Sequence, residues 1–155
     1  MPTDVSLVDI VEGAKSSWAS VSALTAIIPA SRVYFQRAAE STSLPYALVT
    51  TDDVSAFYGG TEYDSSQYYK KSTRVNFKVY FPADFDISAF ATILNDAFGW
   101  TATNPAASWT IPNATKILSA MPEVEKLEIE EERVDGKDVI RYESSFTVTM
   151  VAYRG

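Results

Sequence analysis

Two segments in which apolar and polar residues alternate restrict the fold of this chain more than any other feature does. Alternation over residues 73–81 places Val75, Phe77 and Val79 on one side of a strand, with charged or polar groups on the other. Residues 138–153 alternate in the same way, and a strand of that length would extend about 50 Å. The sequence therefore predicts a sheet with one buried face and an unusually long last strand.

The residues before this last strand predict that it forms half of a hairpin. Residues 115–133 are expected to form its partner strand, interrupted at Pro122, where a bulge or an edge position would accommodate the missing N–H. Asp135 and Gly136 then favour a two-residue turn of the primed type. We expect the tip of this hairpin to extend beyond the core.

Two amphipathic helices are predicted from apolar residues that recur at steps of three and four. The first covers residues 7–20, with Ser6 as its N-cap and Asp9 placed to complete a capping box. The second covers residues 87–98, is capped by Asp86 and stops before a glycine.

Shorter elements complete the predicted fold. Strands are expected at residues 32–36 and 46–51, with a long connection over residues 53–71. We expect one α+β domain over residues 1–155: a two-layer arrangement of an antiparallel sheet of about four to five strands, two helices on one face and a long C-terminal hairpin. The core should form from Phe77, Val79, Phe90, Leu94, Phe146 and Val148.

Two residue types are absent, which limits the chemistry of the chain. Its 155 residues include no His and no Cys. This excludes an imidazole base, a thiolate nucleophile and the common zinc ligands. No nucleotide-binding or nucleophile motif is present either. We therefore predict no catalytic residue, no cofactor, no metal site and no enzymatic activity.

The net charge of −7 argues against tight binding of nucleic acid, which requires a basic surface. No apolar run approaches the ~20 residues that span a bilayer. The acidic N-terminal segment lacks the basic region of a signal peptide. We expect no association with a membrane, and synthesis in the cytoplasm.

Most of the negative charge lies in the predicted hairpin. Residues 123–143 hold nine acids and four bases, and Glu128, Glu130 and Glu132 share one face of the strand. This acidic face is either a solvated surface that keeps a long edge from aggregating or a surface that meets a basic neighbour or a passing polyanion. A matching basic set is expected on the outer face of the preceding strand: Lys70, Lys71, Arg74 and Lys78.

Aromatic residues are concentrated in the connection over residues 53–71. Tyrosines in a loop with Gly and Ser suit protein contacts, because each supplies contact area at a low cost in side-chain entropy. The alternative is that these rings pack partly onto the chain's own sheet. The candidates are Phe57, Tyr58, Tyr63, Tyr68 and Tyr69.

Several segments follow one another in the order of a known protein family. A helix ending in LTAIIP at residues 24–29 precedes RVY at 32–34, and LPYALV follows at 44–49. The strand RVNFKVY at 74–80 then leads into the second helix, and an Asp-Gly hairpin closes the chain. This layout resembles the tail-terminator family of long-tailed bacteriophages, also called tail completion or minor tail proteins.

The resemblance implies a structural protein that assembles into a ring, usually a hexamer, which caps the tail tube and joins it to the neck. Genomic DNA would pass through the lumen without specific binding, and the partners would be the tail tube protein and neck or adaptor proteins. The chain would reside in the virion tail after assembly in the host cytoplasm. A head-tail adaptor or connector and a tail tube subunit are alternatives within the virion. A carboxylate-dependent enzyme and a monomeric binding module are alternatives from other classes.

In such a ring, the hairpin is the expected contact between subunits. Opposite charges on the hairpin and on the basic strand face would set the register, but exposed ion pairs contribute only ~0–1 kcal/mol each. Apolar residues of the hairpin must therefore supply most of the stabilisation. We expect these to be Leu127, Ile129, Ile140 and Tyr142.

Overall fold

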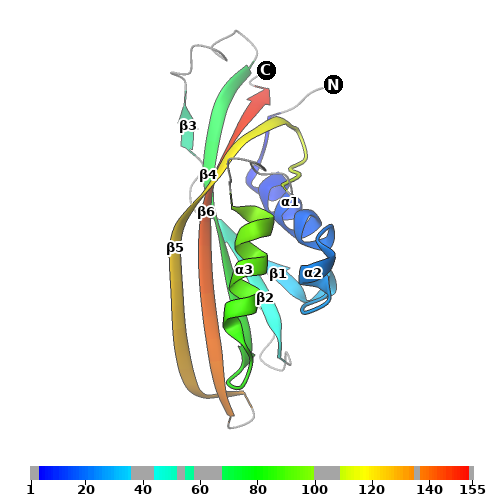
Figure 1. The fold of residues 1–155 in the computed structure, drawn as a ribbon. Coiled ribbons are helices and arrows are strands. Elements are labelled where there is room, and N and C mark those ends of the chain that lie inside the picture. The colour runs from blue at the N-terminus through cyan, green and yellow to red at the C-terminus, as the bar shows by residue number, and fades with distance from the viewer. Residues whose placement is uncertain are drawn as a thin grey trace.

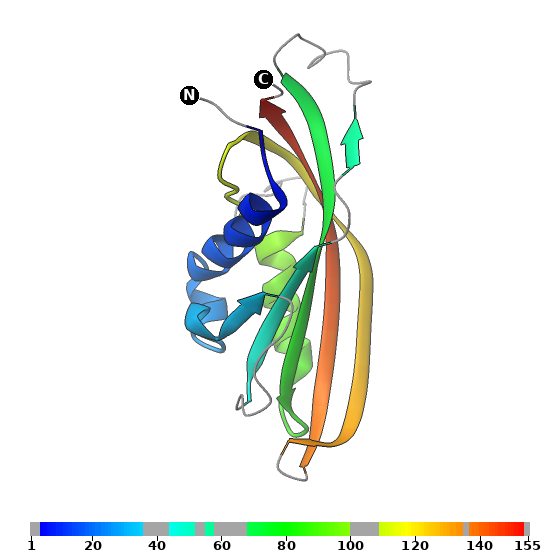
Figure 2. The same ribbon diagram turned by 180° about the vertical axis from the view of Figure 1, so that it is seen from behind.

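The computed structural model of the chain describes residues 4–35, 44–51, 55–57, 68–99, 109–134 and 137–153. In this part of the chain, helices cover one face of a six-stranded sheet, as the two ribbon views show (Figures 1 and 2). The predicted α+β class is therefore confirmed. No helix within the described ranges is long and apolar enough to cross a bilayer.

The sheet has the strand order β1–β2–β4–β6–β5, and β3 pairs with the beginning of β4. All neighbouring strands are antiparallel except β1 and β2, which are parallel. The strands are β1 (Val33–Phe35), β2 (Tyr46–Thr51), β3 (Ser55–Phe57), β4 (Tyr68–Pro82), β5 (Ala114–Val134) and β6 (Lys137–Tyr153).

The mixed sheet differs from the antiparallel one that the sequence predicts. Alternation shows which residues share a face of a strand, but it carries no information on the direction in which that strand runs. The ten residues between Phe35 and Tyr46 are long enough to return the chain to the end of the sheet where β1 began. β1 runs parallel to β2 and lies at one edge of the described sheet.

β4 is longer than predicted, and this changes how the C-terminal hairpin is held. β4 begins at Tyr68, within the segment predicted as a connection, and pairs with β6 from Tyr153 to Val139. The hairpin therefore belongs to the sheet over nearly its whole length, and only its tip extends beyond β4. β5 lies at the edge, with the register shift predicted near Pro122 present between that residue and Val124.

The helices begin and end close to where the sequence predicts. α1 (Leu7–Ala19) has the expected capping box between Ser6 and Asp9, and α3 (Ile87–Phe98) begins at the Asp86 cap. Two shorter helices follow α1: α2 (Ser22–Thr25) and the 3-10 helix η1 (Ala30–Arg32).

The core lies between the helices and the inner face of the sheet, and all six predicted members are fully buried. Trp18 of α1 and Phe90 of α3 lie 6.1 Å apart, measured between ring centroids. Phe77 of β4 lies 5.7 Å from Trp18 and stacks on Phe98 of α3 at 4.9 Å. Aromatic contacts thus join both long helices to the central strand.

A second apolar cluster lies on the opposite face of the sheet, where the alternation predicts solvent exposure for Tyr80. That residue is instead buried, and its ring stacks on Tyr46 of β2 at 4.8 Å. Leu48 and Val139 are buried in the same cluster. The prediction that Tyr80 lies on the outer face is correct. The predicted exposure is wrong, because β2 and β6 supply apolar neighbours on that face.

Candidate subunit interface

The charged residues of the outer sheet face form a network across three strands. Lys78 of β4 lies 3.7 Å from Glu143 of β6, and Arg141 Nε lies 3.7 Å from the same carboxylate. Arg141 also forms an ion pair with Glu128 of β5. Lys78 and Glu128, predicted to meet across two subunits, therefore both have partners within their own chain. Their contacts crosslink the strands at a gain of about 0–1 kcal/mol each.

The other basic residues of β4 lie on both faces of the sheet. Lys70 and Arg74 have the same strand parity as Lys78 and share its outer face, where Arg74 is exposed and Lys70 half-buried. Lys71, predicted on this face, lies on the inner one, because successive residues of a strand point to opposite sides. Its side chain is only 11% exposed and contacts the N-terminal segment.

The four apolar hairpin residues fall into two groups. Ile140 and Tyr142 of β6 are buried against the chain's own helices and strands. Leu127 and Ile129 of β5 are 59% and 67% exposed. Both lie on the inner face, because Leu127 pairs with Tyr142 and Ile129 with Ile140. The structure thus leaves Leu127 and Ile129, of these four, free to contact another protein.

The remaining predicted site residues lie partly outside the described residues. Tyr58 and Tyr63 fall there, as do the side chains of Phe57, Glu130 and Glu132. Tyr68 and Tyr69 belong to β4 rather than to a loop. The Tyr68 ring is half-buried, 5.6 Å from that of Tyr153, and Tyr69 is buried. These two rings therefore pack on the chain's own sheet.

A small polar pocket lies between α3 and the hairpin. Its lining includes Asn95, Pro122 and Glu125, and its volume is ≈ 120 Å³. Pockets for small-molecule ligands usually measure roughly 300–1,000 Å³. The hydroxyl of Tyr142 donates a hydrogen bond to Glu125 at 2.6 Å. Burial and this contact with a carboxylate raise the pKa of Tyr142, so the phenol stays protonated and acts as a structural donor.

Metal ligands are not gathered at this pocket or elsewhere in the described ranges. No group of three or more Asp, Glu, His or Cys residues in those ranges could hold a metal ion. The candidate site is therefore best described as a surface: a long edge strand with exposed apolar side chains.

Comparison with solved structures places this geometry in a known architecture. A chain described as "Virion of native gene transfer agent (GTA) particle" superposes with a TM-score of 0.62. The match covers 92% of this chain and 95% of the other, at 13% sequence identity. The two chains share a fold.

The likeness is one of structure and does not extend to sequence. No protein-family model matches the chain. No curated protein matches it either. At 13% identity the superposition establishes the arrangement of strands and helices, and the similar coverage of both chains shows that this arrangement is shared over nearly their full lengths.

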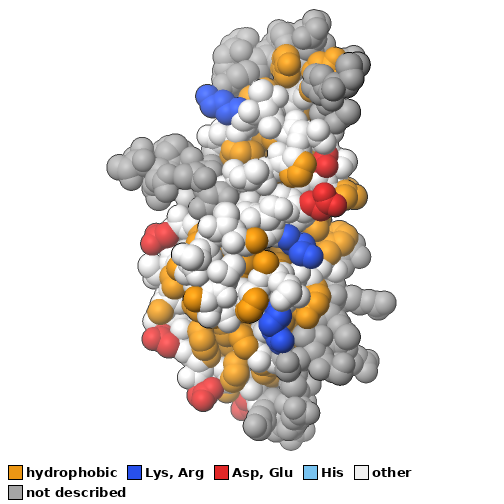
Figure 3. Space-filling view, turned by 90° about the vertical axis from the view of Figure 1, so that its right-hand side faces the viewer, with side chains coloured by type: hydrophobic (Ala, Val, Ile, Leu, Met, Phe, Trp, Pro, Cys, Tyr) orange, Lys and Arg blue, Asp and Glu red, His pale blue; other side chains and the backbone are white. Residues whose placement is uncertain are grey.

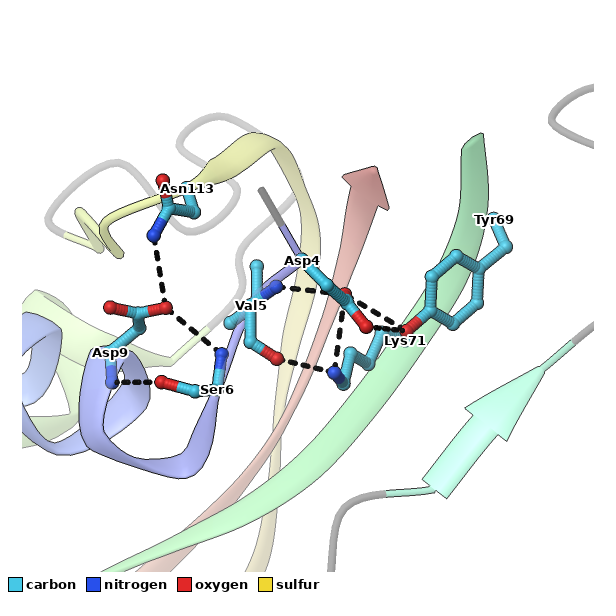
Figure 4. A network of polar contacts seen from close by, with 7 residues as sticks. All are labelled: Asp4, Val5, Ser6, Asp9, Tyr69, Lys71 and Asn113. Atoms are coloured by element: carbon cyan, nitrogen blue, oxygen red, sulfur yellow. Dashed lines mark hydrogen bonds and ion pairs between the residues drawn. The ribbon is translucent and has the colours of Figure 1, made fainter. Parts of the chain in front are cut away.

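The structure also shows a polar network at the N-terminal segment that sequence analysis missed (Figure 4). The hydroxyl of Tyr69 donates to both carboxylate oxygens of Asp4, at 2.9 and 3.0 Å. Lys71 Nζ donates to the Val5 carbonyl and lies 3.3 Å from the Asp4 carboxylate. These contacts fasten the segment before α1 to β4.

The same network continues through the first turn of α1. Asp9 accepts hydrogen bonds from the backbone N–H of Ser6 at 2.9 Å and from the side-chain amide of Asn113 at 3.0 Å. Partial burial acts to raise the pKa of Asp9, but these hydrogen bonds and the charge of Lys71 lower it overall. Asp9 thus links α1 to the segment that leads into β5.

We expect Asp9→Asn to destabilise the protein in a pH-dependent way. A carboxylate in the first turn of a helix contributes about 0.3–1 kcal/mol. Because the folded-state pKa is below the ordinary value of 3.8, this contribution is complete at neutral pH and is lost as the pH falls through the folded-state pKa. Urea unfolding of wild type and Asp9→Asn, from neutral pH down to a pH below the folded-state pKa, should show the difference in their free energies of unfolding shrinking toward zero.

A matched control is Asp96→Asn in the last turn of α3, where a negative charge opposes the helix dipole. This change should not lower the free energy of unfolding at neutral pH. A difference between wild type and Asp9→Asn that stayed constant down to the lowest pH would contradict a role for the ionised carboxylate.

Proposed function

We propose that this chain is a non-enzymatic structural protein of a phage-like virion, which forms a ring at the end of the tail tube. The observation that carries the proposal is the shared fold with the gene transfer agent virion chain, over 92% of this chain. The resemblance to tail terminators in the order of segments supports the finer assignment. A hexamer that caps the tube and joins it to the neck is the form we propose.

The exposed surface of the hairpin supports assembly. A long edge strand with exposed apolar side chains promotes uncontrolled aggregation in a monomer, and natural proteins usually avoid or cover it. β5 has 21 residues and carries Met121, Leu127 and Ile129 as large exposed apolar side chains. A ring would cover part of this strand with the next copy.

The charge of the chain suits a lumen through which DNA passes. The net charge of −7 disfavours phosphate binding, so genomic DNA would move past the ring without specific contacts. The tail tube protein and the neck or adaptor proteins would be the other partners, and the protein would be found in the tail of the virion.

Immunogold electron microscopy of purified particles tests this placement. We expect label for the chain at the head-proximal end of each tail. Label along the whole tube would instead indicate a tube subunit, and particles without label would contradict a virion role. Particles labelled for the major tail tube protein provide the control for antibody access.

A further inference from the structure

Large exposed apolar side chains occur at both edges of the sheet. Leu127 and Ile129 lie on β5 at one edge, and Phe35, 45% exposed, lies on β1 at the other. Each of these strands pairs on one side only among the described strands. Figure 3 views the side of the molecule that carries α1, α2 and β1, where hydrophobic side chains are spread among both acidic and basic ones.

The register of the strands shows that the two apolar edges share one face of the sheet. Phe35 pairs with Val49, which pairs with Phe77 of the core. Leu127 pairs with Tyr142, whose ring lies 6.1 Å from that of Phe90 in α3. Both edges therefore present their apolar side chains on the face that the helices cover.

The two apolar edges also lie at nearly the same level along the strands. From β1, the paired positions run from Val33 through Ala47, Val79 and Tyr142 to Leu127. Phe35 is two residues from Val33, so along the strands it is offset by about 7 Å from Leu127 and by about 13 Å from Ile129. Two copies can therefore meet edge to edge with little displacement along the strands. A closed ring needs such a small displacement, because head-to-tail contacts that do not close produce an open filament.

We propose that β5 of one copy lies against β1 of the next copy, with Phe35 packed against Leu127 and Ile129 of its neighbour. This interface rests on the proposed function, because a ring requires two different surfaces that meet head to tail. Continuing the sheet would also give hydrogen-bond partners to the outer edges of both strands.

A second copy of the chain fits this surface better than an unrelated peptide does. A peptide strand added to β5 would cover Leu127 and Ile129 but would leave Phe35 exposed at the opposite edge. Head-to-tail association covers both edges in every subunit, and the last copy meets the first.

Mixing two variants, each with one edge disabled, tests the interface. One variant carries Leu127→Asp with Ile129→Asp, and the other carries Phe35→Asp. Circular dichroism would establish that both fold, and serine substitutions at the same positions replace any aspartate variant that does not. Val8→Asp, at an exposed apolar position of α1, is the control.

Native mass spectrometry should find each edge variant monomeric at concentrations at which wild type and the Val8→Asp control form rings. An equal mixture of the two edge variants should form a dimer and nothing larger, because each dimer joins one intact β1 edge to one intact β5 edge. A mixture that stays monomeric, or a variant that still forms rings, would overturn the interface.

The outcomes also separate this interface from the proposed function. Rings that persist in both edge variants would contradict the interface alone. A wild-type chain that never assembles, even on particles, would contradict both. Cysteine crosslinking gives an independent readout, since the chain has no native Cys. Phe35→Cys mixed with Leu127→Cys should form more disulfide-linked dimer than either variant alone, and equal yields would also overturn the interface.

Discussion

Replacing Phe77 by Ala is expected to lower the free energy of unfolding by about 3–5 kcal/mol, as typical for deletion of a buried aromatic side chain. Phe77 is fully buried at the centre of the sheet, and its ring contacts those of Trp18, Phe98 and Phe146. Removing it would leave a cavity that both helices border. Urea unfolding monitored by circular dichroism measures the change.

Phe35→Ala provides the matched control, because Phe35 is a phenylalanine on the same face but is 45% exposed. We expect this change to alter the stability of the isolated chain by less than about 0.5 kcal/mol. A loss below about 1 kcal/mol for Phe77→Ala would contradict the assigned inner face of β4.

Replacing Trp18 by Ala should have an effect of similar size, about 3–5 kcal/mol. The indole is fully buried, and its centroid lies 5.7, 6.1 and 6.4 Å from the ring centroids of Phe77, Phe90 and Phe98. Its Nε1–H donates to the Ile28 carbonyl at 2.9 Å, which joins α1 to the turn that ends the helical segment. Thermal and urea unfolding would both report the loss.

Trp18→Phe separates packing from hydrogen bonding at this position. Phenylalanine retains an aromatic ring but leaves the buried Ile28 carbonyl without its donor, which typically costs about 1–3 kcal/mol. The loss for Trp18→Phe should therefore be smaller than that for Trp18→Ala. Equal losses in the two variants would show that the ring makes little contribution to packing.

Elements specified by neighbouring residues could be predicted from the sequence. The capping box at Ser6 and Asp9 marks the beginning of α1, and Asp86 marks that of α3, because a cap depends on residues within one turn. The inner face of β4 follows from alternation, which is also local. The predicted core was confirmed for the same reason.

Features that depend on distant parts of the chain could not be predicted. The parallel pairing of β1 with β2 and the early beginning of β4 depend on which strands become neighbours. The need for a glycine at position 13 also depends on a distant residue. A Cβ there would lie 2.8 Å from the Cα of Ile111, which is nearly one hundred positions away in the sequence. The contact of Lys71 with Asp4 likewise depends on the fold of the N-terminal segment.

The candidate interface was partly predictable. The alternation places Leu127 and Ile129 on the same face as Ile140 and Tyr142, but it does not show that α3 covers β6 and leaves much of β5 uncovered. Phe35 was missed because a three-residue strand gives almost no periodic signal. Its exposure becomes meaningful only when the sheet order places β1 and β5 at opposite edges.

The mass of the assembled protein tests the central claim, that copies of this chain close into a ring, most directly. Native mass spectrometry over a concentration series, with the complex released from particles as a second sample, is the measurement. We predict monomer and one discrete larger species, a hexamer, with no intermediates accumulating at high concentration. Monomer in both samples, or an open series of ever larger species, would contradict a closed ring.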